Sequence, residues 1–198
     1  MLKIIQKYLD ISVIKVSAII ALLYFLLFNT PIILSQFINY KVEFLNAMLK
    51  IFQDSIVVYA GLCIMFFGLS INTLLFLSAA HFLFFTGAIA SYYFYFFNVV
   101  PNTEIIGAVF NTDINQIHEM VTTKLILWLI FSMFVCTYTI KYFKVNDTKL
   151  FLSKLISAIC LLVTVYNMIF LTDRVLSNFF PFQYIHNTYL YFIHALLH

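Results

Sequence analysis

The chain has 198 residues, of which 64% are hydrophobic and 10% are charged, and its mean hydropathy is +1.01. Soluble domains contain about 45–50% apolar and about 25% charged residues, so this composition excludes a soluble globular domain and indicates an integral membrane protein. The formal net charge of +3 comes from lysines that flank apolar runs, and these do not form a basic patch for nucleic acid.

The long apolar runs of the sequence predict the positions of the helices. Only four glycines and three prolines interrupt the chain, which favours continuous helices over short strands. Because one span needs about 20 residues, the uncharged residues 55–103 must hold two spans, with a turn between Ser70 and His81. Residues 29–54 are mixed and predict a loop that contains an interfacial helix. We therefore predict an all-α integral membrane protein with five transmembrane helices, at about residues 11–28, 55–75, 80–99, 125–143 and 151–172.

Residues 102–121 form an amphipathic segment between two apolar runs. At about 100° per residue, one face of a helix here is apolar and the opposite face is polar. Such a helix lies in the membrane interface and does not cross the bilayer. The apolar face holds Ile106, Phe110, Ile114, Ile117 and Val121, and the opposite face holds Ala108, Thr112, Asn115, Gln116 and Glu119.

Residues 173–198 return to mixed character and predict a linker with a second interfacial helix. Residues 1–172 then form the five-helix membrane domain, and this last segment lies outside it. The predicted apolar stripe of the segment is Phe182, Ile185, Tyr189, Phe192 and Leu196.

The distribution of basic residues predicts the topology. Five spans place the two termini on opposite sides, and the positive-inside rule then favours a cytoplasmic N-terminus and an external C-terminus. In that orientation seven lysines face the cytoplasm and four basic residues face outward. The cytoplasmic ones are Lys3, Lys7, Lys15, Lys141, Lys144, Lys149 and Lys154, and the external ones are Lys41, Lys50, Lys124 and Arg174.

Several polar and aromatic residues have a simple structural interpretation. His194 and His198 have the i, i+4 spacing of a zinc-binding pair, but a solvated polar stripe is the interpretation we favour, so we predict no metal site. His81 lies near the predicted turn, and a polar turn facing the cytoplasm explains it better than a proton relay. The aromatic residues 92–97 are interpreted as core and interfacial belt.

The stretch SYYFYFFNVVPNTEIIGAVFNTDINQ, residues 91–116, resembles a known family. It is similar to the segment after the third span of bacterial lipid A phosphoethanolamine transferases, a family that includes the mobile colistin-resistance enzymes. In that family a helix end with a small residue, Tyr and Phe leads to Gly-Val-x-Ile-Asp and then to Met-Ile-x-Asn-Val-x-x-Thr-(Asp/Asn)-x-x-Glu. The later Pro-Phe-Gln-Tyr-Ile, residues 181–185, is similar to the family's Pro-Tyr-x-Tyr-Ile.

The resemblance implies that this chain is the N-terminal membrane domain of such an enzyme. In the family a periplasmic domain with an alkaline-phosphatase-like fold follows, and it carries the threonine nucleophile and the zinc ligands. The expectation is therefore a truncated protein, inactive alone, with no catalytic residue and no cofactor of its own.

The resemblance also implies a headgroup site for the donor lipid. The family's Asn, Thr and Glu, spaced by four, match Ala108, Thr112 and Gln116, of which only Thr112 is retained. Glu119 projects from the same helix face one turn later and offers a replacement carboxylate. The expected site for donor phosphatidylethanolamine is thus Thr112, Gln116 and Glu119, although a solvated face of an interfacial helix explains the same residues.

The expected function is to anchor the transferase in the bacterial inner membrane and to position phosphatidylethanolamine for transfer to lipid A or another envelope acceptor, a modification linked to polymyxin resistance. The expected partners are the membrane lipid and, if it is separately encoded, a periplasmic catalytic domain. The alternative is a non-enzymatic membrane protein that binds lipid or docks onto such a domain. A small transporter ranks third because ionisable groups are nearly absent from the spans.

Overall fold

The computed structural model describes residues 11–39, 44–97, 121–143, 151–170 and 179–183, together with residues 187 and 190. All the elements in these ranges are helices, which confirms the all-α prediction for the described part of the chain. They are α2 (Ile11–Tyr24), the π-helical turn η1 (Phe25–Asn29), α3 (Thr30–Asn39), α4 (Phe44–Leu69), α5 (Thr73–Phe97), α8 (Thr123–Phe143) and α9 (Phe151–Phe170).

Four helical stretches within the described ranges are long and apolar enough to cross a membrane. A shorter apolar stretch, Ser153–Tyr166, lies in α9 at the position of the fifth predicted span. The structure therefore supports four spanning helices by length and composition, while the count of five stays a prediction. The four are Val13–Ser35, Met48–Leu69, Thr73–Phe97 and Thr123–Tyr142.

The first helix continues well beyond its predicted end at residue 28. A loop was expected at residues 29–54, but the described residues 29–39 and 44–54 are helical, because α3 follows η1 without a break and α4 begins at Phe44. Pro31 suggested the loop, since proline removes a helical hydrogen bond and clashes with the carbonyl four residues earlier. The wider turn of η1 comes directly before Pro31 and accommodates the ring, so the helix runs through it.

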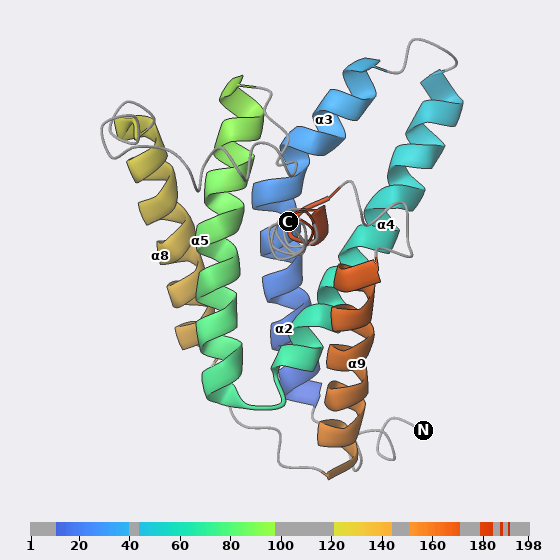
Figure 1. The fold of residues 1–198 in the computed structure, drawn as a ribbon, viewed down its shortest axis with the longest axis vertical. Helices are drawn as coiled ribbons and strands as arrows, with labels where there is room; N and C mark the ends of the chain where they lie inside the picture. The colour runs from blue at the N-terminus through green and yellow to red at the C-terminus, as the bar shows by residue number, and fades with distance from the viewer. Residues whose placement is uncertain are drawn as a thin grey trace, which may run out of the picture.

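The helices alternate in direction, as Figure 1 shows. The start of α2, the α4–α5 turn and the start of α9 lie at one end, and the ends of α3 and α5 and the starts of α4 and α8 lie at the other. α4 packs against α2 and α9, α5 packs against α8, and η1 contacts α5. We refer to the end with α3 and the start of α8 as the α3 end.

The α4–α5 turn confirms the prediction that residues 55–103 hold two helices. Asn72 caps α5, because its Oδ1 accepts hydrogen bonds from the backbone N–H of Leu74 at 2.8 Å and of Leu75 at 3.4 Å. His81 lies inside α5 and not in a turn. Its Nε2 lies 3.1 Å from Thr137 Oγ1 on α8, so it connects two helices.

A pair of hydrogen bonds fixes residues 179–183 in the bundle. Asn29 is fully buried, and its Nδ2 donates to the Phe180 carbonyl at 3.1 Å, while its Oδ1 accepts from the Phe180 N–H at 2.9 Å. Phe179, Phe180 and Phe182 are all buried in the core. The expected place of Phe182 on an interfacial stripe is therefore wrong, and the rest of that predicted stripe lies outside the described residues.

Replacing Asn29 by Leu should destabilise the protein strongly. The substitution removes both hydrogen bonds from Asn29 to the buried backbone of Phe180, and losing a hydrogen bond to a buried group costs about 1–3 kcal/mol. The melting temperature in detergent should fall by several degrees, and Phe180→Cys should become more reactive to a thiol reagent in the Asn29→Leu background. Ser78→Ala is the control, because the Ser78 hydroxyl bonds carbonyls of its own helix. Equal melting temperatures for Asn29→Leu and the control would contradict the role of the pair.

Close packing of α4 on α9 depends on Gly68. A Cβ at this position would lie 2.7 Å from the Leu161 backbone nitrogen, so backbone would have to move. For Gly68→Ala, overpacking of about 1–3 kcal/mol should outweigh the gain of about 1 kcal/mol in helix propensity. We expect a lower melting temperature for Gly68→Ala and no change for Ala60→Val, which enlarges an exposed position of the same helix. A Gly68→Ala protein as stable as wild type would show that α9 does not pack this closely.

Candidate functional site

The predicted headgroup residues belong to a segment that the structure does not describe. Thr112, Gln116 and Glu119 lie within residues 98–120, and His194 and His198 also lie outside the described ranges. The positions at which this segment joins the fold are known, since α5 ends at Phe97 and α8 begins at Thr123. A site that includes this segment therefore adjoins the end of α5 and the start of α8.

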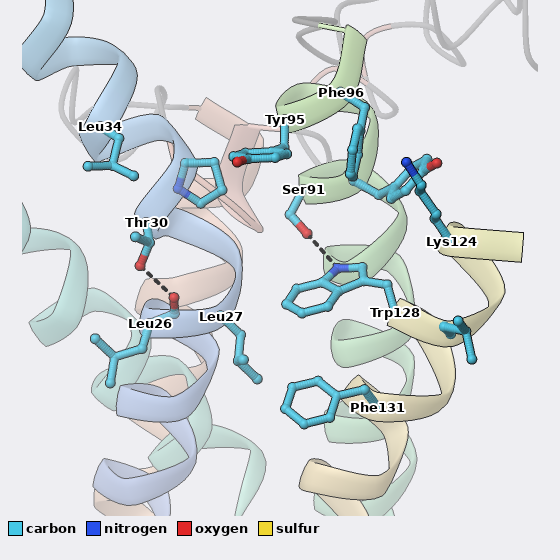
Figure 2. A pocket seen from close by; sticks show the side chains of 13 residues that line it. Leu26, Leu27, Thr30, Leu34, Ser91, Tyr95, Phe96, Lys124, Trp128 and Phe131 are labelled. Carbon is cyan, nitrogen blue, oxygen red and sulfur yellow. Dashed lines mark hydrogen bonds between the residues drawn. The ribbon is translucent and has the colours of Figure 1, made fainter. Parts of the chain in front are cut away.

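An open groove lies at this place, between α3 and η1 on one side and α5 and α8 on the other (Figure 2). We call it the α3–α8 groove. Its volume of about 660 Å³ lies within the range of about 300–1,000 Å³ that is usual for ligand sites. Its lining is Leu26, Leu27, Thr30, Pro31, Leu34, Ser91, Tyr92, Tyr95, Phe96, Lys124, Leu127, Trp128 and Phe131.

The first wall of the groove is the π-helical turn and the start of α3. The wide turn places Leu26 and Leu27 beside Thr30 and Pro31 along this wall. The Thr30 hydroxyl donates to the carbonyl of Leu26, so its polar group is satisfied inside the helix. This wall therefore presents carbon atoms to the groove although it contains a threonine and a proline.

The second wall is held by hydrogen bonds between α5 and the start of α8. Trp128 Nε1 donates to Ser91 Oγ at 3.2 Å, the contact drawn in Figure 2. A second contact joins the same two segments, because the hydroxyls of Tyr92 and Thr122 are hydrogen-bonded to each other. Thr122 Oγ1 also accepts from the N–H of Leu125 at 3.2 Å and so caps α8. The last turns of α5 and the start of α8 are thus joined beside the groove.

Packed aromatic rings support the groove from behind. Phe28 meets the rings of Tyr24 and Phe84 edge to face, with centroid distances of 4.7 and 5.4 Å, and the Trp128 ring at 6.3 Å. Gly87 lets α5 approach these rings, because a Cβ there would lie 2.9 Å from Phe28 Cδ2. The edge-to-face pairs stabilise one arrangement of the two walls.

The groove is polar at its mouth and apolar along its length. Lys124 is exposed at the mouth, and its Nζ lies 5.6 Å from the centroid of the Phe96 ring. Figure 2 shows Lys124, Phe96 and Tyr95 at one end, and Leu26 and Phe131 at the opposite end. An amphiphile with a small polar group and a hydrocarbon chain matches this distribution of side chains.

Sequence reasoning missed this groove. Tyr92, Tyr95 and Phe96 were interpreted as core and belt, yet all three line the groove. Trp128, the single tryptophan of the chain, was the available signal, since an indole N–H in an apolar helix needs an acceptor on a neighbour. No local spacing identifies Ser91, 37 positions earlier, as that acceptor.

The sequence model described as Phosphoethanolamine transferase EptA/EptB matches residues 58–196, more than two thirds of the chain. The match includes α5 and α8, which form the second wall, while η1 and α3 precede it. No match to the chain was found among curated proteins or solved structures.

Proposed function

This chain belongs to the phosphoethanolamine transferase EptA/EptB family, as the sequence resemblance predicted, and from that premise we propose that it positions the donor lipid. It is a membrane domain of that family, with helices long and apolar enough to span the bilayer. In the proposed role it anchors the transferase and presents phosphatidylethanolamine for transfer to lipid A or another envelope acceptor. The α3–α8 groove is the observation that supports this role.

The groove supports a lipid ligand because it opens sideways between apolar side chains that would face hydrocarbon. Leu34 and Leu127, on opposite walls, are 52% and 62% exposed. A lipid can enter such a site from the bilayer without crossing a polar surface.

The headgroup is proposed to lie at residues 98–120, which connect the two helices of the second wall. In this proposal Thr112 donates a hydrogen bond to a phosphate oxygen, and Glu119 contacts the ammonium in place of Gln116. An amide at position 116 can only hydrogen-bond the ammonium, whereas a carboxylate adds charge and binds it more strongly.

The proposed location is the bacterial inner membrane, with five spans, a cytoplasmic N-terminus and a periplasmic C-terminus. The alternating directions of α2, α4, α5, α8 and α9 support this topology, with α9 as the fifth span. The groove opens at the α3 end, which is then the periplasmic end, where the acceptor is presented.

We expect alkaline phosphatase fused after His198 to be active and green fluorescent protein fused there to be dark. The reason is the seven-to-four excess of basic residues on the proposed cytoplasmic side. Fusions in the α4–α5 turn, after Ile71, should show the opposite pattern and serve as the internal control. A fluorescent fusion after His198 would show that the topology is wrong.

Donor positioning predicts selective binding of phosphatidylethanolamine. Native mass spectrometry of the purified chain should show tighter binding of phosphatidylethanolamine than of phosphatidylglycerol with the same acyl chains. Glu119→Gln should abolish that preference, since a charge-assisted hydrogen bond of roughly 1.5–3 kcal/mol corresponds to about tenfold or more in affinity.

Substitutions that restore the family pattern should act in the opposite direction. Ala108→Asn with Gln116→Glu should strengthen the preference for phosphatidylethanolamine. If wild type binds both lipids equally and no substitution changes the ratio, the 102–121 segment is an interfacial anchor and the donor site lies elsewhere.

A further inference from the structure

We propose that the α3–α8 groove holds one acyl chain of a glycerophospholipid and that Lys124 binds its phosphate, whatever headgroup the phosphate carries. The inference rests on the proposed function only in taking a membrane lipid as the ligand. It adds Lys124 as the residue that positions the phosphorus atom, and this contact does not depend on how the headgroup is recognised.

The shape of the groove fits an acyl chain that extends from a phosphate. Lys124 and Phe131 both line it from α8, and at 1.5 Å per residue they lie about 10 Å apart along the helix axis. The lining between them is apolar, with Leu27 on the facing wall and Leu127 and Trp128 on α8. A chain whose phosphate lies at Lys124 therefore points along the helices toward the middle of the bundle.

Charge complementarity selects an anionic group at the mouth. Lys124 is the charged side chain among the described residues of the lining. The described part of the chain has a single carboxylate, Asp54, on α4, and α4 contributes no residue to this lining. The Phe96 ring orients the Lys124 ammonium by a cation–π contact, and an ammonium has three donors to offer an oxygen.

The surroundings favour a lipid over a protein segment as the occupant. Leu26, Leu127 and Phe131 are 52%, 62% and 49% exposed, on helices whose length and composition suit a membrane. Lipid chains surround such a surface at high local concentration. A lipid also satisfies Lys124 and the apolar lining with one molecule.

A phosphate contact cannot distinguish headgroups. Phosphatidylethanolamine and phosphatidylglycerol share the phosphodiester and differ only beyond it. Lys124→Gln should therefore weaken the binding of both by about tenfold and leave their ratio unchanged. This behaviour differs from that of Glu119→Gln, which should change the ratio.

The test is a native mass spectrometry titration of the purified full chain with three ligands of identical acyl chains. The ligands are phosphatidylethanolamine, phosphatidylglycerol and diacylglycerol, which lacks the phosphate. Lys124→Gln should lose affinity for the first two and bind diacylglycerol as wild type does, and Lys124→Arg should retain affinity for all three. Lys141→Gln is the matched control, since Lys141 is an exposed lysine of the last turn of α8.

A separate pair of variants tests whether the groove holds an acyl chain. Leu26→Trp adds bulk to a residue that lines the groove, and Leu22→Trp adds it one turn earlier, at a residue that is 43% exposed and outside the lining. Leu26→Trp should weaken all three ligands several-fold, and Leu22→Trp should leave them unchanged. Melting temperatures of all variants should stay close to that of wild type, because both leucines and Lys124 are exposed.

The outcomes test the phosphate contact, the acyl-chain site and the donor preference of the proposed function separately. Unchanged phospholipid binding by Lys124→Gln, or an equal loss for diacylglycerol, would overturn the phosphate contact. Unchanged lipid binding by Leu26→Trp would overturn the acyl-chain site. A wild-type dimer that Leu26→Trp dissociates would also overturn it, because the groove would then be filled by another copy of the chain. If Lys124→Gln weakens both phospholipids while wild type prefers neither, this inference holds and the donor preference of the proposed function fails. If wild type prefers phosphatidylethanolamine and Lys124→Gln has no effect, the donor preference of the proposed function holds and the Lys124 phosphate contact fails.

Discussion

Asn29 is an amide inside a packed apolar core, and the arrangement of the α3 end depends on how it is satisfied. A buried amide without partners costs several kilocalories per mole, so Asn29 needs a donor and an acceptor inside the core. The backbone of Phe180 supplies both, from 151 positions away in the chain. The same two hydrogen bonds satisfy the N–H and the C=O of Phe180, which lie in a non-helical turn inside the core. The pair therefore connects the first helix with residues 179–183, and Phe180 in turn packs against Phe94 on α5, with ring centroids 6.5 Å apart.

The same stretch of the first helix gives the groove its wall. η1 ends at Asn29, and the helix continues through Pro31 because the wider turn makes room for the proline ring. On one face of this irregular stretch, Phe28 and Asn29 are buried in the core. The residues on another face line the groove: Leu26, Leu27, Thr30 and Pro31. A regular helix with a proline here would kink, and the wall would then separate from α8. The core pair and the groove are thus two consequences of one local distortion.

The sequence predicted the helices well and the irregular features poorly, for a physical reason. Hydropathy over about 20 residues reports burial in lipid or protein, so both ends of α8 and the end of α5 were predicted within two residues, whereas α5 begins seven residues before the predicted start. Asn29 is polar and Pro31 is helix-breaking by local rules. The partner that satisfies the buried amide lies 151 positions away, and the π-helical turn that makes room for the proline has no local sequence signal. The groove could not be predicted either, since its walls come from three separate helices and its key contact joins Trp128 to Ser91. The headgroup residues Thr112, Gln116 and Glu119 stay a prediction from the family resemblance.

Affinity, position and selectivity for a lipid have separate sources in such a site. A lipid chain that leaves the bilayer for the α3–α8 groove exchanges one apolar environment for another, so it gains packing and little hydrophobic free energy. In the proposed site the groove therefore fixes the direction of the chain and contributes less affinity than the phosphate contact. In the proposed site, a charge-assisted contact between Lys124 and the phosphate supplies affinity, but it is common to all phospholipids. Selectivity is a difference of affinities, so it has to come from groups that meet the headgroup beyond the phosphate. In the proposed arrangement the phosphate lies at Lys124, a few residues after the 98–120 segment in the sequence, and a carboxylate in that segment would distinguish an ammonium from a glycerol.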